Sequence, residues 1–295
     1  MLPTALDHPN VHTLLTLALQ EDLTAGVLLP DPPSSGDVTA TATIPAHQTV
    51  TANFLVKARG VVAGLPIAQE VFRRVDANVT FEIDRPDGSP VQPSDVVARV
   101  TGNARSILVA ERPALNFLGR LSGIATLTAQ FVAAIAGTGA TMLDTRKTAP
   151  GFRLLDKYAV RMGGGKNHRL ALYDMAMIKD NHVAAVGGVL PAVERIRALY
   201  GETFPIILEV TTLAQLQQAL PLAVTRILLD NMDLPTLRQA VALRNQFTHS
   251  FTPLEASGGV TLQTVRQIAE TGVEYISSGA LTHSATVFDM SLEVL

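Results

Sequence analysis

Cationic side chains are concentrated between residues 144 and 182, where the sequence offers its clearest chemistry. Eight lysines and arginines stand there against four aspartates, a local charge of about +4 in a chain whose net charge is −3. Such a run can be a solvated basic face, a nucleic-acid patch or a pocket for anions. Nucleic-acid patches usually interleave aromatic residues with their cations, and Tyr158 and Tyr173 give this interpretation little support.

The placement of the cations favours the anion pocket. Arg146 and Lys147 come directly after one predicted strand, and Lys179 ends the next. Between them, three glycines at 163–165 expose backbone N–H groups beside His168 and Arg169. The glycines alone would indicate no more than a turn. Together with cations at strand ends, they predict a site for several carboxylate or phosphate groups.

Two loops late in the sequence have the composition of phosphate-binding loops. Ser257, Gly258 and Gly259 follow one short apolar run, and Ser278 and Gly279 follow the next. Small residues let a phosphate approach the backbone, and the start of a following helix supplies N–H donors. The alternative is that each serine only caps a helix. Paired loops after the last two strands of a barrel favour phosphate binding.

Two acids, Glu209 and Asp230, end consecutive predicted strands. Paired acids amid cations can hold a metal ion, act as acid and base, or stabilise a developing positive charge. They can also form structural salt bridges with the same cations. The chain has no cysteine and no HExxH motif, so a tightly bound zinc ion is not expected. A Mg²⁺ ion that shares its ligands with substrate phosphates suits these oxygens better.

A series of short apolar runs must position these residues. Each run ends in a polar side chain and is followed by a helical stretch, and the later ends recur every 20–30 residues or so, roughly the length of one strand–helix unit. Six such units predict an α/β barrel, complete or incomplete, rather than an open doubly wound sheet. The carboxyl ends of barrel strands converge on one face, where active sites lie. The predicted strands are residues 141–143, 175–178, 205–208, 226–229, 253–254 and 274–276.

The first part of the sequence predicts a separate α/β domain. Residues 12–20 and 66–74 have helical patterns, and residues 50–62 alternate like a half-buried strand. Residues 105–135 predict two or three helices, interrupted at Pro113 and Gly119. Residues 286–295 alternate as a strand with one apolar face, so we expect them to return to the first sheet. The patterns predict one domain over residues 1–122 plus 284–295 and a second over residues 123–283.

Composition restricts the class of protein further. Although 47% of the residues are hydrophobic, no apolar run reaches the roughly 18 residues that a membrane span needs. Asp7 and His8 precede any apolar stretch, and no basic segment starts the chain, so a secretory leader is not expected. The absence of cysteine excludes disulfides and a thiol nucleophile, and it is consistent with a cytoplasmic protein.

With these motifs in place, the sequence closely resembles the quinolinate phosphoribosyltransferase family (nicotinate-nucleotide pyrophosphorylase, carboxylating). The resemblance runs over nearly the whole chain and implies an N-terminal α/β sandwich domain followed by an incomplete, seven-stranded α/β barrel. It departs from the family near the N-terminus, where an insertion over residues 24–35 interrupts a stretch that is usually compact. The motifs that carry it are residues 111–116, 144–148, 157–165, 167–169, 178–182, 209–210, 229–232, 255–259 and 278–279.

The resemblance also implies roles for the site residues. Arg112 would reach into the pocket of a partner subunit and bind a quinolinate carboxylate, so the working unit would be a homodimer or a higher oligomer. Lys147 would lie closest to the reacting centre, and Glu209 and Asp230 would lie near the ribose hydroxyls and a Mg²⁺ ion, held through water and substrate. The other implied ligands of carboxylate or phosphate are Arg146, His168, Arg169, Lys179, Ser257, Gly258, Gly259, Ser278 and Gly279.

The implied reaction transfers phosphoribosyl from 5-phosphoribosyl 1-pyrophosphate to quinolinate with loss of CO₂. Its products are nicotinate mononucleotide and pyrophosphate, which places it in NAD biosynthesis. One alternative is a related transferase, either nicotinate-specific or associated with molybdenum transport, and another is a nonenzymatic barrel that binds phosphosugars. Retention of all the carboxylate-binding cations favours quinolinate, and the acids weigh against binding alone. Neither nucleic acid nor membrane is expected as a partner.

Overall fold

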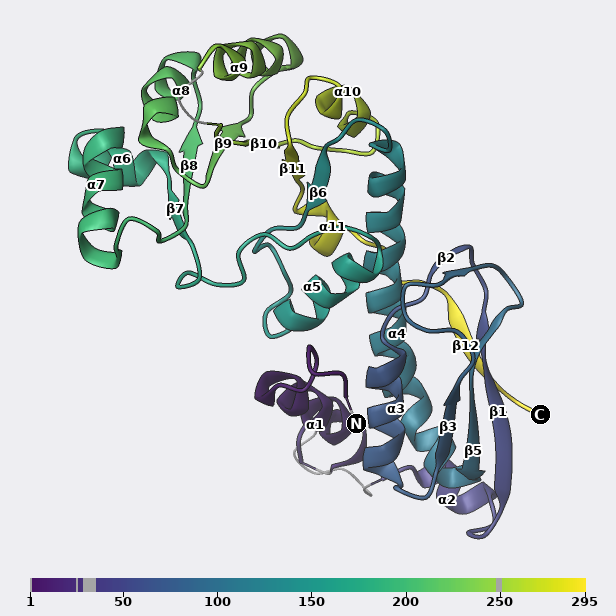
Figure 1. Cartoon of the computed structure of the whole chain (residues 1–295). Helices are drawn as coiled ribbons and strands as arrows, with labels where there is room; N and C mark the ends of the chain where they lie inside the picture. The colour runs from purple at the N-terminus through teal and green to yellow at the C-terminus, as the bar shows by residue number, and fades with distance from the viewer. Residues whose placement is uncertain (1, 25, 29–35, 248–250) are drawn as a thin grey trace. The chain divides into compact units, whose positions relative to one another are not determined.

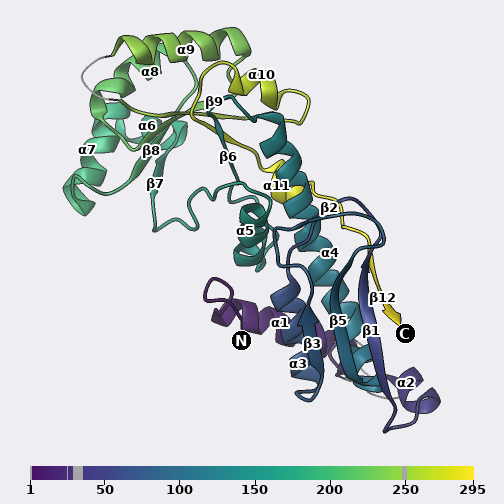
Figure 2. The ribbon, with the colours of Figure 1, turned by 45° about the vertical axis from the view of Figure 1, so that its right-hand side comes forward.

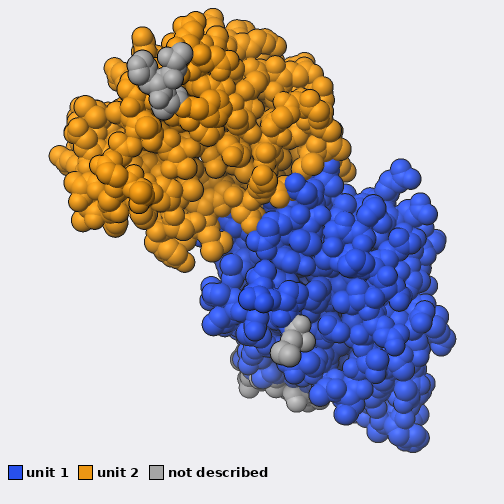
Figure 3. Space-filling view, in the orientation of Figure 1, with its two compact units in different colours: residues 1–129, 148–164, 284–295 blue, residues 130–147, 165–283 orange. Residues whose placement is uncertain are grey.

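The computed structural model describes residues 2–24, 26–28, 36–247 and 251–295 and divides into two compact units (Figure 1). Unit 1 comprises residues 1–129, 148–164 and 284–295, and unit 2 comprises residues 130–147 and 165–283 (Figure 3). Residues 148–164, which lie within the second domain expected from the sequence, are thus grouped with unit 1. Most of the insertion over residues 24–35 lies outside the described residues.

Unit 1 contains a four-stranded antiparallel sheet in the order β12-β1-β5-β3. In β1, Ala52, Phe54 and Val56 alternate and are buried, as expected for a strand with one apolar face. Phe54 meets Phe72 and Phe81 at ring-centroid distances of 5.8 and 5.5 Å, which joins the sheet to helix α3. The strands are β1 (Thr49–Val56), β3 (Thr80–Ile83), β5 (Val96–Asn103) and β12 (Met290–Val294), and α3 is Leu65–Val75.

The last strand returns to the first sheet, as the alternation of residues 286–295 predicts. β12 pairs antiparallel with β1, with Ala52 opposite Val294, and both ribbon views show the two strands side by side (Figures 1 and 2). The strand begins only at Met290. The residues before it run along a helix, because two glycines of that helix leave room for them.

That helix is α4 (Ala104–Ala134), and its 31 residues are continuous, so the prediction of two or three helices is wrong. Pro113 lacks one backbone donor but does not end the helix. Gly119 and Gly123 are positions of close approach and not interruptions. A Cβ atom at Gly123 would lie 2.0 Å from the Thr286 carbonyl oxygen, and the Phe288 N–H donates to the Gly119 carbonyl at 2.8 Å.

By length and composition, α4 could cross a membrane, and it is the one helix among the described residues that could. Of its most apolar window, 56% is buried inside the structure. Burial of this kind is usual for the core helix of a globular protein, so α4 gives only weak support for a membrane span.

The remaining helices of unit 1 complete its core. Asp156 of α5 is fully buried, and Arg120 of α4 donates to both of its carboxylate oxygens, at 2.9 and 2.8 Å. A short ladder joins β2 (Gly60–Val61) to β4 (Pro90–Val91). The helices are α1 (Pro9–Leu23), α2 (Val38–Thr43) and α5 (Arg153–Met162).

Unit 2 contains a parallel sheet of six strands in the order β6-β11-β10-β9-β8-β7. Strands β6 and β7 follow each other in the sequence but lie at opposite edges of the sheet, whereas the other consecutive strands are neighbours. This is the arrangement of an incomplete barrel. Each of the six predicted runs overlaps one of these strands, although the run at residues 253–254 shares only Leu254 with β10. Their bounds are β6 (Thr141–Leu143), β7 (Ala176–Ile178), β8 (Ile206–Val210), β9 (Arg226–Asp230), β10 (Leu254–Ser257) and β11 (Tyr275–Ser277).

The expected seventh strand is reduced to one bridge among the described residues. Lys166 pairs in parallel with Leu143 of β6; its N–H donates to the Met142 carbonyl at 2.9 Å, and its carbonyl accepts from the Asp144 N–H at 3.2 Å. The glycines before Lys166 favour turns over an extended strand, so no regular strand forms there.

Helices follow the strands of unit 2 as the strand–helix pattern predicts. Contacts join α7 to β7 and α8 to β8, and α10, which follows β10 in the sequence, contacts the next strand, β11. The helices are α6 (Asp180–Val186), α7 (Val189–Tyr200), α8 (Leu213–Ala219), α9 (Leu234–Gln246), α10 (Val265–Ala269) and α11 (Ala280–His283), with a 3₁₀ turn at Leu220–Leu222.

Candidate active site

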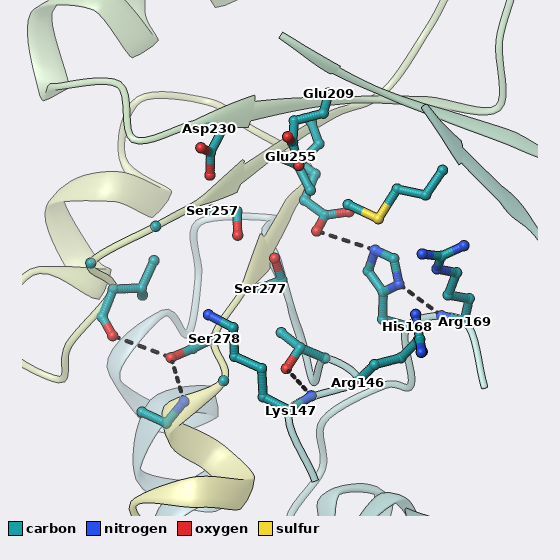
Figure 4. Close-up of a pocket in the computed structure, with 18 of the residues that line it drawn as sticks. Arg146, Lys147, His168, Arg169, Glu209, Asp230, Glu255, Ser257, Ser277 and Ser278 are labelled. Carbon is teal, nitrogen blue, oxygen red and sulfur yellow. Dashed lines mark hydrogen bonds and ion pairs between the residues drawn. The ribbon is translucent and has the colours of Figure 1, made fainter. Parts of the chain in front are cut away.

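A cavity of about 430 Å³ opens at the carboxyl ends of the strands of unit 2 (Figure 4). Parallel strands bring their carboxyl ends to one rim, and this is why polar residues so far apart in sequence meet there. The site residues predicted from the sequence all line it except Arg112, which lies in α4 within unit 1. Those that line it are Arg146, Lys147, His168, Arg169, Lys179, Glu209, Asp230, Ser257, Gly258, Gly259, Ser278 and Gly279.

Two guanidinium groups on one side of the cavity, those of Arg146 and Arg169, repel each other. Burial lowers the pKa of the Arg169 guanidinium, and the positive charge of Arg146 lowers it further, while Asp174 acts in the opposite direction. The Nε atom of Arg146 is buried and has no hydrogen-bond partner among the described residues. An anion bound between the two guanidinium groups would relieve their repulsion and satisfy this donor.

Lys147 is fixed by its surroundings. Its N–H donates to Thr145 Oγ1 at 3.0 Å, and its carbonyl accepts from Thr282 Oγ1 at 2.8 Å. A Cβ atom at Gly279 would lie 2.8 Å from Lys147 Cδ, so the glycine lets the lysine stem cross the loop after β11. Gly279 therefore has a packing role toward Lys147, which the sequence alone does not predict.

The two acids stand at the ends of neighbouring strands, β8 and β9. Glu209 Oε2 lies 3.3 Å from Lys179 Nζ. Glu209 therefore forms one of the salt bridges with the cations that the sequence offered as an alternative role for the acids. No group of three or more His, Asp or Glu side chains able to hold a metal ion occurs among the described residues. Two carboxylates fit a Mg²⁺ ion that takes its other ligands from substrate and water, because Mg²⁺ usually keeps several such ligands.

Asn231, directly after Asp230, has an unusual backbone. Its φ of +53° lies in the left-handed region, which asparagine tolerates better than most residues. Its Nδ2 donates to Asp230 Oδ2 at 2.9 Å, and its N–H donates to the Ser257 carbonyl at 2.9 Å. A Cβ atom at Gly258 would lie 2.1 Å from Asn231 Oδ1. Asn231 thus connects the acid to the glycine loop.

The glycine loop after β10 differs from its prediction in one respect. Gly258 and Gly259 have φ values of +96° and +60°, a conformation that side chains disfavour. Helix α10 begins only at Val265 and not directly after the glycines, where the sequence predicts it. The N–H groups available to an anion are therefore those of the loop itself and not those of a helix N-terminus.

In the second loop, Ser278 caps a helix, as the alternative to phosphate binding predicts. Ser278 Oγ accepts from the Ala280 N–H at 3.3 Å at the start of α11, and it donates to the Val260 carbonyl at 3.2 Å. Ser278 is buried, and its hydroxyl joins the two loops to each other. Its support of the loops is therefore visible in the structure, whereas a direct contact with phosphate stays a prediction.

Glu255 is the main lining residue for which the sequence predicts no role. It is fully buried; its Oε2 lies 2.6 Å from Arg226 Nη1 and its Oε1 lies 3.5 Å from His168 Nε2. Burial raises the pKa of its carboxyl, but the interactions with His168 and Arg226 lower it more, so the pKa is below its ordinary value. The sequence does indicate that Glu255 lines the site, because residues 255 and 257 of one strand share a face and Ser257 is a predicted site residue. His283 and Ser277 also line the cavity.

An incomplete parallel barrel with cations, two acids and two small-residue loops at its rim belongs to the class of α/β-barrel proteins that bind phosphorylated, multiply anionic ligands. Profiles of both domains of one family match the chain. The C-terminal domain of quinolinate phosphoribosyl transferase matches residues 124–293, and the N-terminal domain matches residues 37–122. The chain belongs to the quinolinate phosphoribosyl transferase family.

Individual relatives agree with the family match. A protein of Oryza sativa subsp. japonica named nicotinate-nucleotide pyrophosphorylase (carboxylating), chloroplastic, is 44% identical over 97% of this chain and 79% of its own length. The structure of the nicotinate-nucleotide pyrophosphorylase from Francisella tularensis has a TM-score of 0.90 at 35% identity and covers 100% of both chains. That of NadC from Streptococcus pyogenes has a TM-score of 0.88 at 39% identity and covers 97% of both chains.

Proposed function

We propose that this protein is a quinolinate phosphoribosyltransferase that releases CO₂ and forms nicotinate mononucleotide. The observation that carries the proposal is the single cavity in which cations, two acids and two glycine loops meet. Quinolinate is a dianion and phosphoribosyl pyrophosphate carries several more charges, so a site for both needs this density of donors. The names of relatives that match nearly the whole chain support the same substrates.

The cations have the task of holding two anions that repel each other. Arg146, Arg169 and Lys179, with His168 beside them, bind the quinolinate carboxylates, and the loops at Gly258 and Gly279 receive the 5′-phosphate. Lys147 extends across the second loop toward the reacting centre. Bringing the reactants into line in this way supplies much of the rate enhancement, because an intermolecular reaction becomes effectively intramolecular.

The acids act on charge that develops during the reaction. As the bond from ribose to pyrophosphate breaks, the ribose becomes oxocarbenium-like, and Glu209 and Asp230 stabilise it electrostatically. The quinolinate nitrogen attacks the anomeric carbon from the opposite face. The bond to the 2-carboxylate then breaks, and the quaternised nitrogen stabilises the electron pair left on the ring until a proton replaces CO₂. Mg²⁺, held by these acids through water and substrate, would supply charge stabilisation for the departing pyrophosphate.

Arg112 completes the site in this proposal from a partner subunit. Arg112 lies in α4 of unit 1, and the family resemblance implies that it reaches the cavity of a neighbouring subunit, so the proposal includes a homodimer or a higher oligomer. The protein would work in the cytoplasm, without nucleic acid or membrane as a partner.

An assay of the purified protein with phosphoribosyl pyrophosphate and Mg²⁺ tests the reaction. With quinolinate, we expect release of CO₂ and nicotinate mononucleotide; with nicotinate alone, we expect no product. Equal use of nicotinate would favour the nicotinate-specific relatives, and binding without turnover would favour the nonenzymatic phosphosugar-binding barrel.

Mixing two inactive variants tests the donation of Arg112. Arg112→Ala and Glu209→Ala proteins should each be inactive, and together they should recover up to about a quarter of the parent activity through hybrid dimers that contain one intact site. Subunit exchange is verified by mass spectrometry of differently labelled subunits. No recovery despite exchange would contradict the donation in trans.

A further inference from the structure

The segment that carries His168 and Arg169 has almost no regular structure of its own. Beyond the bridge at Lys166, residues 167–169 belong to no helix or strand. A segment of this kind needs other contacts to hold two site residues in place. Two fully buried carboxylates, Asp144 and Glu255, provide them.

Asp144 fixes the main chain of the segment. Its Oδ1 accepts from the His168 N–H at 2.8 Å, and its Oδ2 accepts from Asn167 Nδ2 at 2.6 Å. Hydrogen bonds to a buried carboxylate are stronger than those between neutral groups, so position 168 is well determined along the backbone. These bonds do not determine the direction of the His168 ring.

Glu255 faces the ring from β10. Arg226, which lies over the Tyr275 ring at 4.1 Å, holds Glu255 Oε2 at 2.6 Å. The buried Oε1 lies 3.5 Å from His168 Nε2, and the Ser277 side chain also acts on this carboxylate (Figure 4). This distance is at the outer limit of a hydrogen bond, as is common for catalytic contacts before substrate binds.

The other ring nitrogen determines the tautomer. The Arg169 N–H donates to His168 Nδ1 at 2.8 Å, so Nδ1 has a lone pair there and the ring proton is on Nε2. The Nε2–H group then points at Glu255. One imidazole therefore connects the buried carboxylate to the main chain of Arg169, and Figure 4 shows the ring between the two.

We propose that Glu255 is a positioning residue: through His168 it fixes the main chain of Arg169 and thereby directs the guanidinium toward a quinolinate carboxylate, a role that rests on the proposed function. His168 then acts as the link between them. The binding of quinolinate depends on this chain of contacts, and the binding of phosphoribosyl pyrophosphate at the glycine loops does not.

Glu255→Gln tests the role while preserving size. One amide oxygen cannot accept from both Arg226 and His168, so the ring loses its orientation. We expect the KM for quinolinate to rise roughly tenfold, with the KM for phosphoribosyl pyrophosphate changed less than about twofold.

Glu274→Gln is the matched control. Glu274 pairs with Arg244 at 2.9 Å in the same unit, but it does not line the cavity. We expect this variant to lose thermal stability as Glu255→Gln does and to keep both KM values. A folded Glu255→Gln protein with the parent's KM for quinolinate would overturn the role, and so would an equal rise in both KM values.

Nitrogen-15 spectra of ring-labelled histidine test the contact without a kinetic assay. The resonances of His168 are assigned by their loss in His168→Gln, and we expect the Nε2–H tautomer, with a shift that changes in Glu255→Gln. An Nδ1–H tautomer in the parent protein would overturn the proposal even if Glu255→Gln does not fold. If the parent turns over neither substrate, the proposed function fails, and the spectra still decide whether the contact exists.

Discussion

Single residues next to the acids and cations determine how the site is arranged, and Asn231 is an example. Its left-handed backbone directs the side-chain amide to Asp230, and Gly258 leaves room for it. Strain of this kind is retained when the surrounding structure depends on it. The hydrogen bond and the strain can be separated experimentally, because glycine accepts the backbone conformation and alanine does not.

Asn231→Gly should fold like the parent and lose roughly fivefold in kcat/KM, since the lost hydrogen bond to Asp230 is worth about 1 kcal/mol. Asn231→Ala should lose the same activity and also be about 1 kcal/mol less stable to unfolding than Asn231→Gly, because alanine has the Cβ atom that opposes a positive φ and lacks the amide by which asparagine tolerates it. Steady-state kinetics and urea unfolding measure the two effects. Parent-like activity of the glycine variant would show that Asn231 only forms a turn.

At the scale of single residues, the sequence predicts which residues line the site but not which contacts hold their side chains in place. Polar residues at strand ends, such as Glu209 and Asp230, could be predicted because parallel strands bring their ends to one rim. The contact of Glu255 with His168 and the packing of Gly279 against Lys147 could not. Both depend on which side chains face each other across the barrel, and no local pattern encodes this.

Among the elements, the parallel strands follow their sequence pattern more closely than α4 does. Buried parallel strands are short apolar runs between helices, so all six were predictable. Gly119 looks like a break in the sequence of α4, but it and Gly123 are contact positions for residues 286–288. That contact spans more than half the chain, which is why a local pattern predicts several helices where the structure has one.

Helix α3 contains an ion-pair network that should respond to pH. Arg73 and Arg74 donate to the carboxylate of Glu70, at 2.7 and 3.0 Å. The hydrogen bond from Arg73 lowers the pKa of this carboxyl most, burial opposes it, and Arg74 lowers it further, so the pKa is below the ordinary 4.5. The network therefore contributes its full stability above pH 4.5 or so and loses it as the pH falls through the lowered pKa.

Glu70→Gln should reduce the free energy of unfolding by about 1–2 kcal/mol near neutral pH and by less at about pH 3, because the parent then loses the same charge. Urea unfolding at the two pH values measures this difference. Glu82→Gln, a change at an exposed residue of β3, is the control and should have little effect at either pH. A constant difference between Glu70→Gln and the parent would contradict the ionic origin of the effect.

The two units are interleaved in sequence, and this limits what can fold alone. A fragment over residues 123–283 keeps α5 but loses Arg120, the partner of the buried Asp156. Leaving a buried carboxylate unpaired costs about 3–5 kcal/mol, a large part of the stability of a typical domain. We expect the fragment to unfold without a sharp transition in calorimetry and the whole chain to show a sharp one. A cooperative transition in the fragment would contradict this expectation.

The pairing of β12 with β1 has a consequence for synthesis on the ribosome. Chains are made from the N-terminus, and early domains usually fold while later ones are still being made. Here β1 has no partner on one edge until Met290–Val294 are translated, because those residues pair with Ala52–Val56. The unit that starts first must therefore finish last, and the strand edge left open in the meantime is a surface on which nascent chains can aggregate or a chaperone can bind.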